Sequence, residues 1–576
     1  MRPIRKTILI TAAALGAAVV VYVGVTLPSA SRTLSPVQPT TVFGAFHVHT
    51  NRSDGSGSPD DVARAAASAN LQFVVLSDHG DATRTPDPPF YRHGVLIIDA
   101  VEISTTSGHL VALGLTTGSP FPLGGEARDT IEDVHRMGGW VVIAHPDSPK
   151  PGLKWRGDTT GADGVEWLNA DSEWRDESPA ILARTIGHYL IRPSEAIAAL
   201  FDRPAASLHR WDALASEGPV VGLAGIDAHA RVGPDESDGS GDSRNASTIL
   251  ARPSYLDMFG TVVQGIELSQ PLTQQAASDA GVILGALRSG RTYSVVRAIA
   301  SPGRVSFTAS HDAMSWAMGE SVSTDQPVTL QATVPEPSDA VVVLLRGGEE
   351  VASGRGSAVY IHNGAPASYR AEVRLPNRAL PWIVTNAIRV GTSAPPPTTT
   401  VHALGDAVIV KALNDPALWA IERHEPSTGE LTATGGEVGL AFSLAPGRAS
   451  GQYAAMAYPL SGQDRFDAVT MTLRAEPPMR VSMQWRVPRG VDGDRWQRSV
   501  YVDATPRTVT IDLQDFAAVG VGLAATPPLE LVRSLSLVVD TWHTRPGSAG
   551  RVWISGLSLV MKAAGQPITS ALSTTR

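Results

Sequence analysis

The sequence predicts a multidomain protein in which an α/β barrel is followed by two β-sandwich-like domains. First, the chain has 576 residues, which is more than a single hydrophobic core accommodates. Second, short apolar runs alternate with helix-like stretches from 42 to about 300, as is typical of a mainly parallel sheet or barrel. Third, helix signals nearly vanish after 301 and the residues alternate in polarity with period two, which predicts β-sandwiches.

The N-terminal segment 1–31 predicts a transmembrane signal anchor or a signal peptide. Basic residues at positions 2, 5 and 6 precede an uncharged run of twenty residues, 8–27, and such a run at helical rise matches a hydrocarbon core of ~30 Å. An ordinary signal peptide has a shorter apolar region of roughly 7 to 15 residues, so an uncleaved anchor is favoured. Cleavage after Pro28-Ser29-Ala30 and secretion remain the alternative. In both cases the basic end stays inside, and everything after Ser31 lies outside the cytoplasm.

One helix in the predicted barrel, 42–300, is especially legible. Ser58 is the expected N-cap, Pro59 stands at the first helical position and two aspartates follow in the first turn. A second helix-like stretch covers 129–137, and a Gly, Ser and Asp segment at 233–247 predicts an acidic loop. Strand-like runs are expected at 42–46, 73–76, 95–101, 110–114, 140–143, 165–168 and 220–224.

The remainder of the chain predicts two β domains and a linker. Polar and apolar residues alternate over 328–334, and Gly347-Gly348 predicts a hairpin turn in the β-sandwich-like domain 301–392. A Pro/Thr linker, 393–400, ends this domain. The segment 540–550 looks similar to galactose-binding jelly-roll modules, which predicts such a domain over 401–561, and 562–576 is a polar tail.

Composition limits the chemistry. The chain has no cysteine, which excludes disulfides, thiolate metal sites and a cysteine nucleophile. Its formal net charge of -9 argues against a nucleic-acid partner, because proteins that bind phosphate backbones normally present a basic face. Any metal must therefore be held by nitrogen and oxygen atoms.

Histidines gather in the predicted barrel and follow its strand-like runs. Ten of the 15 histidines precede Ala230. His47 and His49 stand two residues apart after an apolar run, and side chains alternate along a strand, so both imidazoles should face the same way. Asp227 and His229 repeat this spacing. The carboxyl ends of barrel strands meet at one face, where we expect these side chains to converge.

Five further candidates stand at equivalent places, so that nine residues form the predicted metal site. They are His47, His49, Asp54, His79, Glu102, His109, His145, Asp227 and His229. Each histidine taken alone is better explained as an ordinary hydrogen-bonded residue, and only the joint placement favours a site. Six imidazoles and three carboxylates without a thiolate suit two or three divalent ions of zinc, manganese or iron.

The same residues carry a family resemblance over about 42–300. The motifs that carry it are 46–50 (FHVHT), 53–55 (SDG), 77–80 (SDHG), 101–103 (VEI), 108–110 (GHL), 144–146 (AHP) and 225–229 (GIDAH). They resemble the polymerase and histidinol phosphatase family, the PHP domain, at all nine positions. The resemblance implies a distorted (β/α)7 barrel with a di- or trinuclear metal centre.

The resemblance also implies how the ions would be shared. It assigns His47, His49, Glu102 and Asp227 to one metal, Glu102, His109 and His145 to a second, and Asp54, His79 and His229 to a third. Glu102 would then bridge two ions and be essential for catalysis. His229 or His79 is a candidate acid only if it is not fully engaged as a ligand.

The function expected from these features is an exported metal-dependent hydrolase, a phosphoesterase that uses a metal-activated water. The first alternative is a carboxyl or carbamate ester or amide hydrolase on the same site, as in relatives similar to carbaryl hydrolase. The second is a cell-surface glycan-binding protein with an accessory barrel. A DNA-processing exonuclease is disfavoured by export and by net acidity, although extracellular nucleotides stay open as substrates.

Other polar and aromatic residues admit two interpretations each. Four tryptophans in the last domain can form a sugar-stacking surface or belong to its core: they are Trp485, Trp496, Trp542 and Trp553. Four basic residues can bind substrate anions but are better explained as surface charges: they are Arg52, Lys154, Arg156 and Arg231. Four histidines away from strand ends are expected to be structural: they are His93, His135, His188 and His209.

Overall fold

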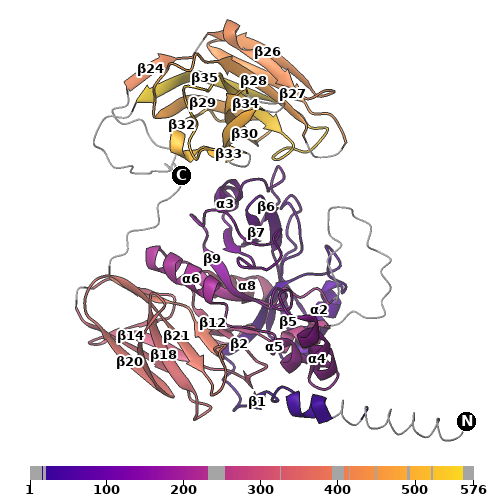
Figure 1. The fold of residues 1–576 in the computed structure, drawn as a ribbon, viewed down its shortest axis with the longest axis vertical. Helices are drawn as coiled ribbons and strands as arrows, with labels where there is room; N and C mark the ends of the chain where they lie inside the picture. The colour runs from indigo at the N-terminus through magenta and orange to yellow at the C-terminus, as the bar shows by residue number, and fades with distance from the viewer. Residues whose placement is uncertain are drawn as a thin grey trace, which may run out of the picture. The chain divides into compact units, whose positions relative to one another are not determined.

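The fold divides into two compact units, which are described one at a time (Figure 1). A computed structural model describes residues 16, 21–230, 253–324, 326–391, 408–413, 415–447, 451–488, 493–519 and 523–561. The first unit comprises Met1–Gly80, Pro86–Thr116 and Gly138–Pro396. The second comprises Asp81–Thr85, Thr117–Met137 and Pro397–Arg576.

Several predicted segments lie outside the described residues. They are most of the predicted anchor, the acidic loop 233–247, the linker 393–400 and the tail 562–576. Within the described ranges, no helix combines the length and the apolar character needed to cross a membrane.

The α/β part of the first unit is built on two sheets. Its strands are β2 (Thr41–Val48), β3 (Phe73–Leu76), β4 (Phe90–Arg92), β5 (Val95–Asp99), β6 (Val101–Thr105), β7 (Gly108–Leu113), β8 (Trp140–Ile143), β9 (Gly164–Asn169), β10 (Val221–Gly225), β11 (Val263–Glu267) and β12 (Thr292–Val295). One sheet has the order β10-β9-β8-β7-β6, and the other contains β12-β11-β2-β3-β5-β4. Isolated parallel bridges, Val48 with Ala228 and His79 with Glu102, connect the two sheets. The prediction of an α/β unit is confirmed, and its strands form two sheets that these bridges connect. The distorted (β/α)7 barrel stays a prediction.

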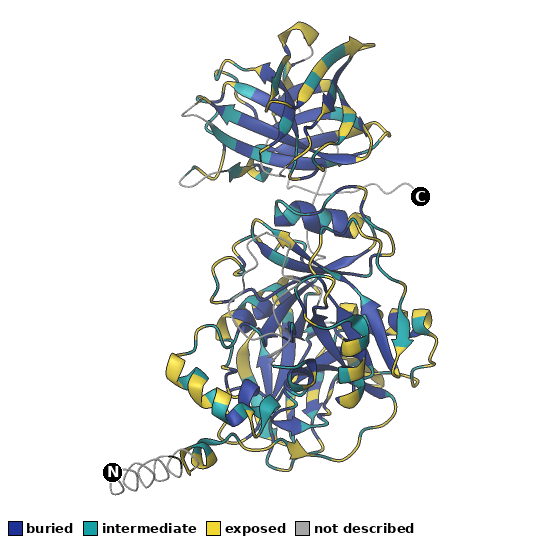
Figure 2. Ribbon diagram, turned by 90° about the vertical axis from the view of Figure 1, so that its right-hand side faces the viewer, coloured by how far each residue is buried: buried dark blue, intermediate teal, exposed yellow. Residues whose placement is uncertain are grey.

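The helices of this unit are α2 (Pro59–Ser68), α4 (Pro179–Tyr189), α5 (Pro193–Ala198), α6 (Ala205–Glu217), α7 (Tyr255–Phe259) and α8 (Ala276–Ser289). Among them, α2, α6 and α8 contact the sheets, whereas α4, α5 and α7 contact other helices. The prediction for α2 is confirmed: Ser58 accepts from the amide of Asp61, and the Asp61 side chain returns the contact in a capping box. The shared core includes Phe46, Phe73 and Trp140, and Figure 2 shows the strands of both units largely buried.

Some strand predictions match closely and one is wrong in a way that matters. The runs 73–76 and 140–143 coincide with β3 and β8. The run 95–101 was expected to be one strand, but the chain leaves β5 at Asp99 and enters β6 at Val101. β5 pairs with β3 in one sheet, whereas β6 pairs with β7 in the other. The break therefore carries the chain between sheets and places Glu102 where they meet.

Residues 301–391 form β structure that continues from the α/β sheet. The strands are β13 (Ala300–Ser301), β14 (Ser306–His311), β15 (Met314–Ala317), β16 (Ser321–Val322), β17 (Val328–Thr333), β18 (Val341–Arg346), β19 (Glu349–Arg355), β20 (Ser357–His362), β21 (Ala367–Arg374), β22 (Ile383–Thr385) and β23 (Ile388–Val390). β15-β14-β17-β20 is one layer, and β20 packs on β18 and β19 of the other. That second layer is continuous with the α/β sheet that contains β12, because β22 pairs with β12. One continuous sheet thus contains strands from both sides of the predicted boundary at 300/301.

A buried ion cluster reinforces this continuity. The Arg370 guanidinium binds Asp212 of α6 through two nitrogens at 2.7 and 2.8 Å. It also donates to Glu372, at 2.8 Å, and Glu372 accepts two bonds from Arg203, at 2.7 and 2.6 Å. Arg370 and Glu372 are buried, so these contacts tie β21 firmly to the α/β helices.

The second unit is a sandwich of two sheets, as the alternating pattern predicts. Its sheets have the orders β26-β27-β35-β29-β32, with β24 on β35, and β25-β28-β34-β30-β31-β33. The strands are β24 (Val408–Ala412), β25 (Ala420–Arg423), β26 (Thr428–Thr434), β27 (Glu437–Ser443), β28 (Tyr453–Pro459), β29 (Ala468–Glu476), β30 (Met479–Val487), β31 (Asp494–Val502), β32 (Arg507–Asp512), β33 (Ala517–Val519), β34 (Ser534–Asp540) and β35 (Ala549–Met561).

The four tryptophans of this sandwich divide between core and surface. Trp485 and Trp496 are fully buried in the core, which removes them from a sugar-stacking surface. Trp553 is half-buried under the guanidinium of Arg474, at 3.7 Å. Trp542 is 56% exposed. Of the four, only Trp542 presents a largely free ring.

Helix α3 (Ala127–Arg136) belongs to the second unit although it lies between β7 and β8 in the chain. Arg480 of β30 is 1% exposed in its side chain and lies 2.7 Å from Asp133, 2.8 Å from Glu132 and 3.2 Å from Asp129. Arg498 of β31 pairs with Asp129 and Glu132 as well. The sandwich therefore holds this helix by buried, charge-assisted bonds.

Candidate metal centre

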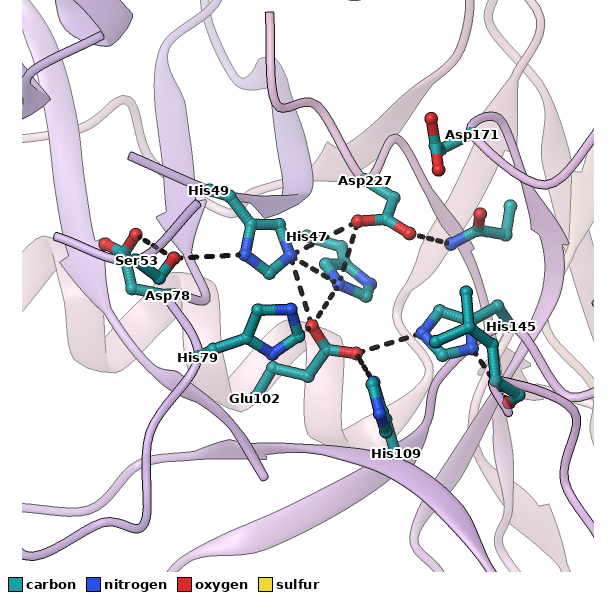
Figure 3. A network of polar contacts seen from close by, with 12 residues as sticks. His47, His49, Ser53, Asp78, His79, Glu102, His109, His145, Asp171 and Asp227 are labelled. Atoms are coloured by element: carbon teal, nitrogen blue, oxygen red, sulfur yellow. Dashed lines mark hydrogen bonds and ion pairs between the residues drawn. The ribbon is translucent and has the colours of Figure 1, made fainter. Parts of the chain in front are cut away.

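The centre is organised around the carboxylate of Glu102, which is 1% exposed. Figure 3 shows imidazoles from several strand ends pointing toward it. Oε1 lies 2.8 Å from His109 and 2.9 Å from His145, and Oε2 lies 3.1 Å from His49, 3.2 Å from His79 and 3.3 Å from His47. One carboxylate thus touches five of the six predicted imidazoles.

Asp227 lies close to His47 and His49 as well. Its Oδ1 is 3.3 Å from His47, 3.2 Å from His49 and 3.6 Å from His229. The Nε2 atoms of His47 and His49 are only 3.1 Å apart. Two imidazole nitrogens and two carboxylate oxygens therefore face one small volume.

Asp54 lies close to three of the histidines. Its carboxylate lies 3.2 Å from His229, 3.4 Å from His49 and 3.8 Å from His79. The side chain of His79 is 34% exposed and those of Asp54 and His229 are 17% exposed, whereas His47 and His49 are fully buried. This is the most solvent-accessible side of the centre.

All nine predicted residues meet in one place. Three groups have ligand atoms within 4.8 Å of one another: His47, His49 and Glu102; His79, Glu102 and His109; and His49, Asp54, His79 and His229. The sequence predicted Asp54, His79 and His229 as the ligands of a third metal, and the structure adds His49 to this group. His79 belongs to two of the three groups. The division of ligands among particular ions stays a prediction.

The backbone at three of the nine residues adopts the left-handed region that most residues avoid. The φ angles are 67° at His47, 31° at His145 and 52° at Asp227. The β2–β3 register also shifts between Ala45 and Val48. His47 and His49 do face the same way, with their Nε2 atoms 3.1 Å apart, but the backbone there departs from a regular strand, so strand alternation alone does not account for it. Such strained positions persist where function requires them.

Sequence reasoning missed Glu166, which orients two of the histidines. Nδ1 of His47 donates to Glu166 Oε1 at 2.6 Å, and the backbone amide of His145 donates to Oε2 at 2.7 Å. Asn169 donates from Nδ2 to Glu166 at 2.8 Å and to Asp227 at 3.2 Å. A Cβ on Gly225 would come within 1.9 Å of Glu166 Oε1, so glycine is required there. The signal was a lone acid inside the apolar strand 165–168.

A second supporting carboxylate fixes the loop after β2. Asp78 accepts from the amide and the hydroxyl of Thr50, both at 2.7 Å, and from the hydroxyl of Ser53 at 2.8 Å. Asp78 immediately precedes His79 in the chain. This carboxylate links the loop that carries Asp54 to the strand end that carries His79.

The electrostatics of the centre demand positive charge. Burial lowers the pKa of His47, but the carboxylates of Asp227, Glu166 and Glu102 outweigh it and raise that pKa well above its usual value. Against the same effect of burial, Asp227 and Glu102 raise the pKa of His49 to about 10. Burial raises the pKa of Glu102, yet the surrounding imidazoles hold it well below its usual range. Protons on imidazoles here balance the carboxylates.

Divalent cations fit this donor set for the same reason. Metals bind the neutral imidazole and the ionised carboxylate, and they replace the protons that the cluster otherwise retains. Glu166 and Asn169 hold ring and carboxylate orientations from behind, which is the role of outer partners at metal sites. The residues present therefore fit divalent metal ions held by nitrogen and oxygen.

The remaining predicted candidates lie in ordinary surroundings. His93 lies 3.1 Å from Asp60, His188 contacts Thr26 at 2.9 Å, and His135 lies on α3. Arg52 pairs with Asp87 and Asp99, and Arg156 donates to a backbone carbonyl. Lys154 and His209 are exposed. Arg231 lies outside the described residues.

Comparison with known proteins finds similarity over parts of the chain. No protein-family model matches the chain. A stretch of 144 residues, 22% of this chain and 80% of the relative, is 29% identical to an uncharacterized protein of Methanocaldococcus jannaschii. A two-domain protein from Bacteroides vulgatus, containing a predicted PHP-like metal-dependent phosphoesterase, aligns over 62% of this chain and 99% of its own, with 13% identity and a TM-score of 0.28. A family 11 carbohydrate-binding module of a cellulase from Clostridium thermocellum aligns over 28% of this chain and 97% of its own, with 12% identity and a TM-score of 0.22.

Proposed function

We propose that this chain is a metal-dependent hydrolase whose preferred substrates are phosphomonoesters. The observation that carries the proposal is the convergence of five imidazoles on the buried carboxylate of Glu102. Isolated buried charges are costly, and an acid surrounded in this way is stabilised by shared cations. The wider set, with Asp54 and Asp227 at its two sides, supports more than one ion.

The ions would supply Lewis acidity, which activates a water molecule and neutralises the charge that develops on the substrate. Sites with several ions suit phosphate esters in particular, because they stabilise both the attacking and the leaving oxygen. Zinc, manganese and iron are the candidates that the nitrogen and oxygen donors favour.

The chain's own residues hold and orient this chemistry. Glu102 would bridge two ions, and Glu166 keeps the ring of His47 fixed through its Nδ1 proton. The exposed edge at His79, Asp54 and His229 would admit the substrate. His229 Nδ1 contacts the backbone carbonyl of Asp227 at 2.9 Å, and Nε2 lies 3.2 Å from Asp54. Nε2 is the atom from which a proton would reach a leaving group if the imidazole is not a ligand.

Carboxyl and carbamate esters and amides are the alternative substrates for the same site. The donor set is identical for an attack at phosphorus and at a carbonyl carbon, so only substrate contacts distinguish them. The deciding experiment is a hydrolysis panel of phosphomonoesters, phosphodiesters, carboxyl esters and carbamates with Zn²⁺, Mn²⁺ or Fe²⁺ added. Turnover of phosphomonoesters that is lost in Glu102→Gln supports the proposal, and no turnover of any ester contradicts it.

Glycan binding by the second unit is a separate candidate function. The largely exposed ring of Trp542 favours it, because one face of a free indole can stack on a sugar. The burial of Trp485 and Trp496 restricts that surface to the loop after β34. A glycan array probed with the parent protein and with Trp542→Ala tests it: binding that Trp542→Ala loses supports the idea, and no binding by the parent contradicts it.

The location proposed for the enzyme is the outer side of a cell membrane, or secretion if the N-terminal segment is cleaved. The basic residues and the apolar run 8–27 support it. If the protein is anchored, protease added to intact cells that make it should digest the catalytic unit. If the N-terminal segment is cleaved, the catalytic unit should instead be recovered from the medium. Complete protection of the chain until the cells are lysed would contradict an exported location.

A further inference from the structure

A cavity of about 200 Å³ shares a wall with the metal centre. Three residues already described at the centre, His145, Glu166 and Asn169, line it. The other walls come from the loops that follow β8 and β9 and from the segment that enters α6. The cavity lies entirely within the first unit.

The cavity lies at the same end of the strands as the centre. β8 pairs with β9, and β9 with β10, in the parallel direction, so their carboxyl ends meet at one edge. His145 follows β8, and Asn169 ends β9. Ligands of α/β folds bind outside the carboxyl ends of strands, so a molecule in this cavity would lie beside the reacting centre.

The lining of the cavity carries more negative than positive charge. Glu173, Asp176 and Asp202 line it and form no ion pair with a basic residue of the described structure, while Arg203 is bound through both terminal nitrogens to Glu372. Glu173 accepts one bond, from the Asp202 amide at 3.0 Å. Burial, followed by the nearby charges of Asp176 and Asp202, raises the pKa of Glu173 to about 8. A cation placed here would relieve that repulsion.

Two buried hydroxyls of the lining have no hydrogen-bond partner. Ser148 is 1% exposed and Ser172 is 6% exposed, and the Oγ atom of each makes no bond within the described structure. Buried hydroxyls are nearly always satisfied, and exceptions call for a ligand or a bound water. Both serines line this one cavity. Their unpaired hydroxyls therefore indicate a ligand there, and this indication is independent of the acidity of the lining.

An organic cation fits these features better than a metal ion does. Among the described residues, the groups of three or more ligand-type side chains close enough to hold one ion are those of the centre, and none includes Glu173, Asp176 or Asp202. Carboxylates spread along a wall, with hydroxyls between them, suit a substituent that carries several hydrogen-bond donors. A protonated primary amine has three.

We propose that the cavity binds the ammonium group of the substrate, and that the chain therefore prefers phosphate esters that carry a protonated amine. The phosphate-ester part of this proposal rests on the proposed function, whereas the binding of the ammonium group in the cavity does not. Asp176 and Asp202 supply the negative charge, the carboxyl oxygens of Glu173 and the hydroxyls of Ser148 and Ser172 accept hydrogen bonds from the ammonium, and the phosphate lies toward His145. The predicted substrate class is the small aminoalkyl phosphomonoesters.

The first test compares 2-aminoethyl phosphate with propyl phosphate, which has the same size but no charge on its tail. For the parent protein, kcat/KM should be about tenfold higher for the amine, the ratio expected for one charge-assisted hydrogen bond. The double variant Glu173→Gln/Asp202→Asn should reduce this ratio to about one. Glu217→Gln, an exposed acid outside the cavity lining, is the matched control and should keep the parental ratio. A parental ratio near one would overturn the proposal.

The second test separates the cavity from the catalytic proposal. Ligand-observed NMR with ethanolamine, and with 1-propanol as the neutral match, is recorded on the Glu102→Gln protein. Selective saturation of ethanolamine that Glu173→Gln/Asp202→Asn removes supports the cavity proposal even if no ester is hydrolysed. Equal saturation of ethanolamine and 1-propanol overturns it. Displacement of ethanolamine by excess Ca²⁺ also overturns it, because the cavity would then be a metal-ion site. Ser172→Ala should weaken the saturation without abolishing it.

Discussion

Glu166 Oε1 accepts a hydrogen bond of 2.6 Å from Nδ1 of His47, while its Oε2 accepts the backbone amide of His145 at 2.7 Å. One buried carboxylate therefore sets the tautomer of the first imidazole and the backbone position of the second. Both histidines have positive φ angles, and this contact helps to hold their backbone in that conformation.

Replacing Glu166 by glutamine should weaken metal binding without emptying the centre. A neutral amide still fills the space but accepts a weaker bond from Nδ1, and loss of such outer partners costs about 10- to 100-fold in metal affinity or activity. Competition against a chromophoric chelator measures the affinity. Glu217→Gln serves as the control, and an unchanged affinity in Glu166→Gln would show that the contact is merely structural.

Glu102→Gln should abolish turnover and lower the bound metal. The neutral side chain cannot balance the surrounding cations, and it removes the oxygen pair that touches five imidazoles. Elemental analysis should find less metal per chain than in the parent, and circular dichroism should show an unchanged fold. Parental turnover by this variant would refute a catalytic role for the centre.

Chelation should destabilise the first unit alone. A ligand present at a hundred times its Kd stabilises the native state by about 2.7 kcal/mol, and removing it reverses that gain. Thermal unfolding followed by calorimetry should show one transition moving to lower temperature after EDTA treatment while the transition of the second unit stays in place. Readdition of Zn²⁺ or Mn²⁺ should restore it. An EDTA-treated protein with the parental thermogram would count against structural metal.

Glu173 should make stability fall as pH rises. Its pKa in the folded protein is raised to about 8, first by burial and then by Asp176, Asp202 and Glu177, so the folded state retains a proton that the unfolded state has released. The favourable contribution is complete below the ordinary glutamate pKa near 4.3 and is lost progressively as the pH approaches and passes 8. The melting temperature of Glu173→Gln relative to the parent should therefore increase from about pH 5 to pH 9. A difference that does not change with pH would contradict the raised pKa.

Arg480→Ala should loosen α3 from the sandwich. Arg480 is 1% exposed and pairs with three acids of α3, and removing one partner of a buried ion pair costs about 3–5 kcal/mol. Urea unfolding of the second unit and proteolysis within 117–137 both report the change. The matched variant Arg507→Ala removes an exposed pair with Asp503 and should cost less than about 1 kcal/mol. Equal effects of the two variants would mean that burial of the cluster contributes nothing.

The amino-acid pattern predicted individual elements well where local signals were strong. The capping residues of α2 and the apolar runs of β3 and β8 act within a few positions, so the chain itself reveals them. Glu166 escaped notice because an acid in an apolar strand gains its meaning only from partners 21 and 119 positions away. Likewise, no local signal indicates that the 95–101 run changes sheets.

By itself, the sequence determined which chemistry is possible: a cysteine-free set of imidazoles and carboxylates at strand ends, which excludes thiolate sites and favours oxygen and nitrogen ligands. Only the tertiary structure decided which atoms share a volume, including the grouping of His49 with Asp54 and the membership of α3 in the second unit. The physical reason is that side-chain direction follows from backbone geometry and sheet register. The register shift between Ala45 and Val48 and the pairing of distant strands set both, and neither can be read from local residue spacing.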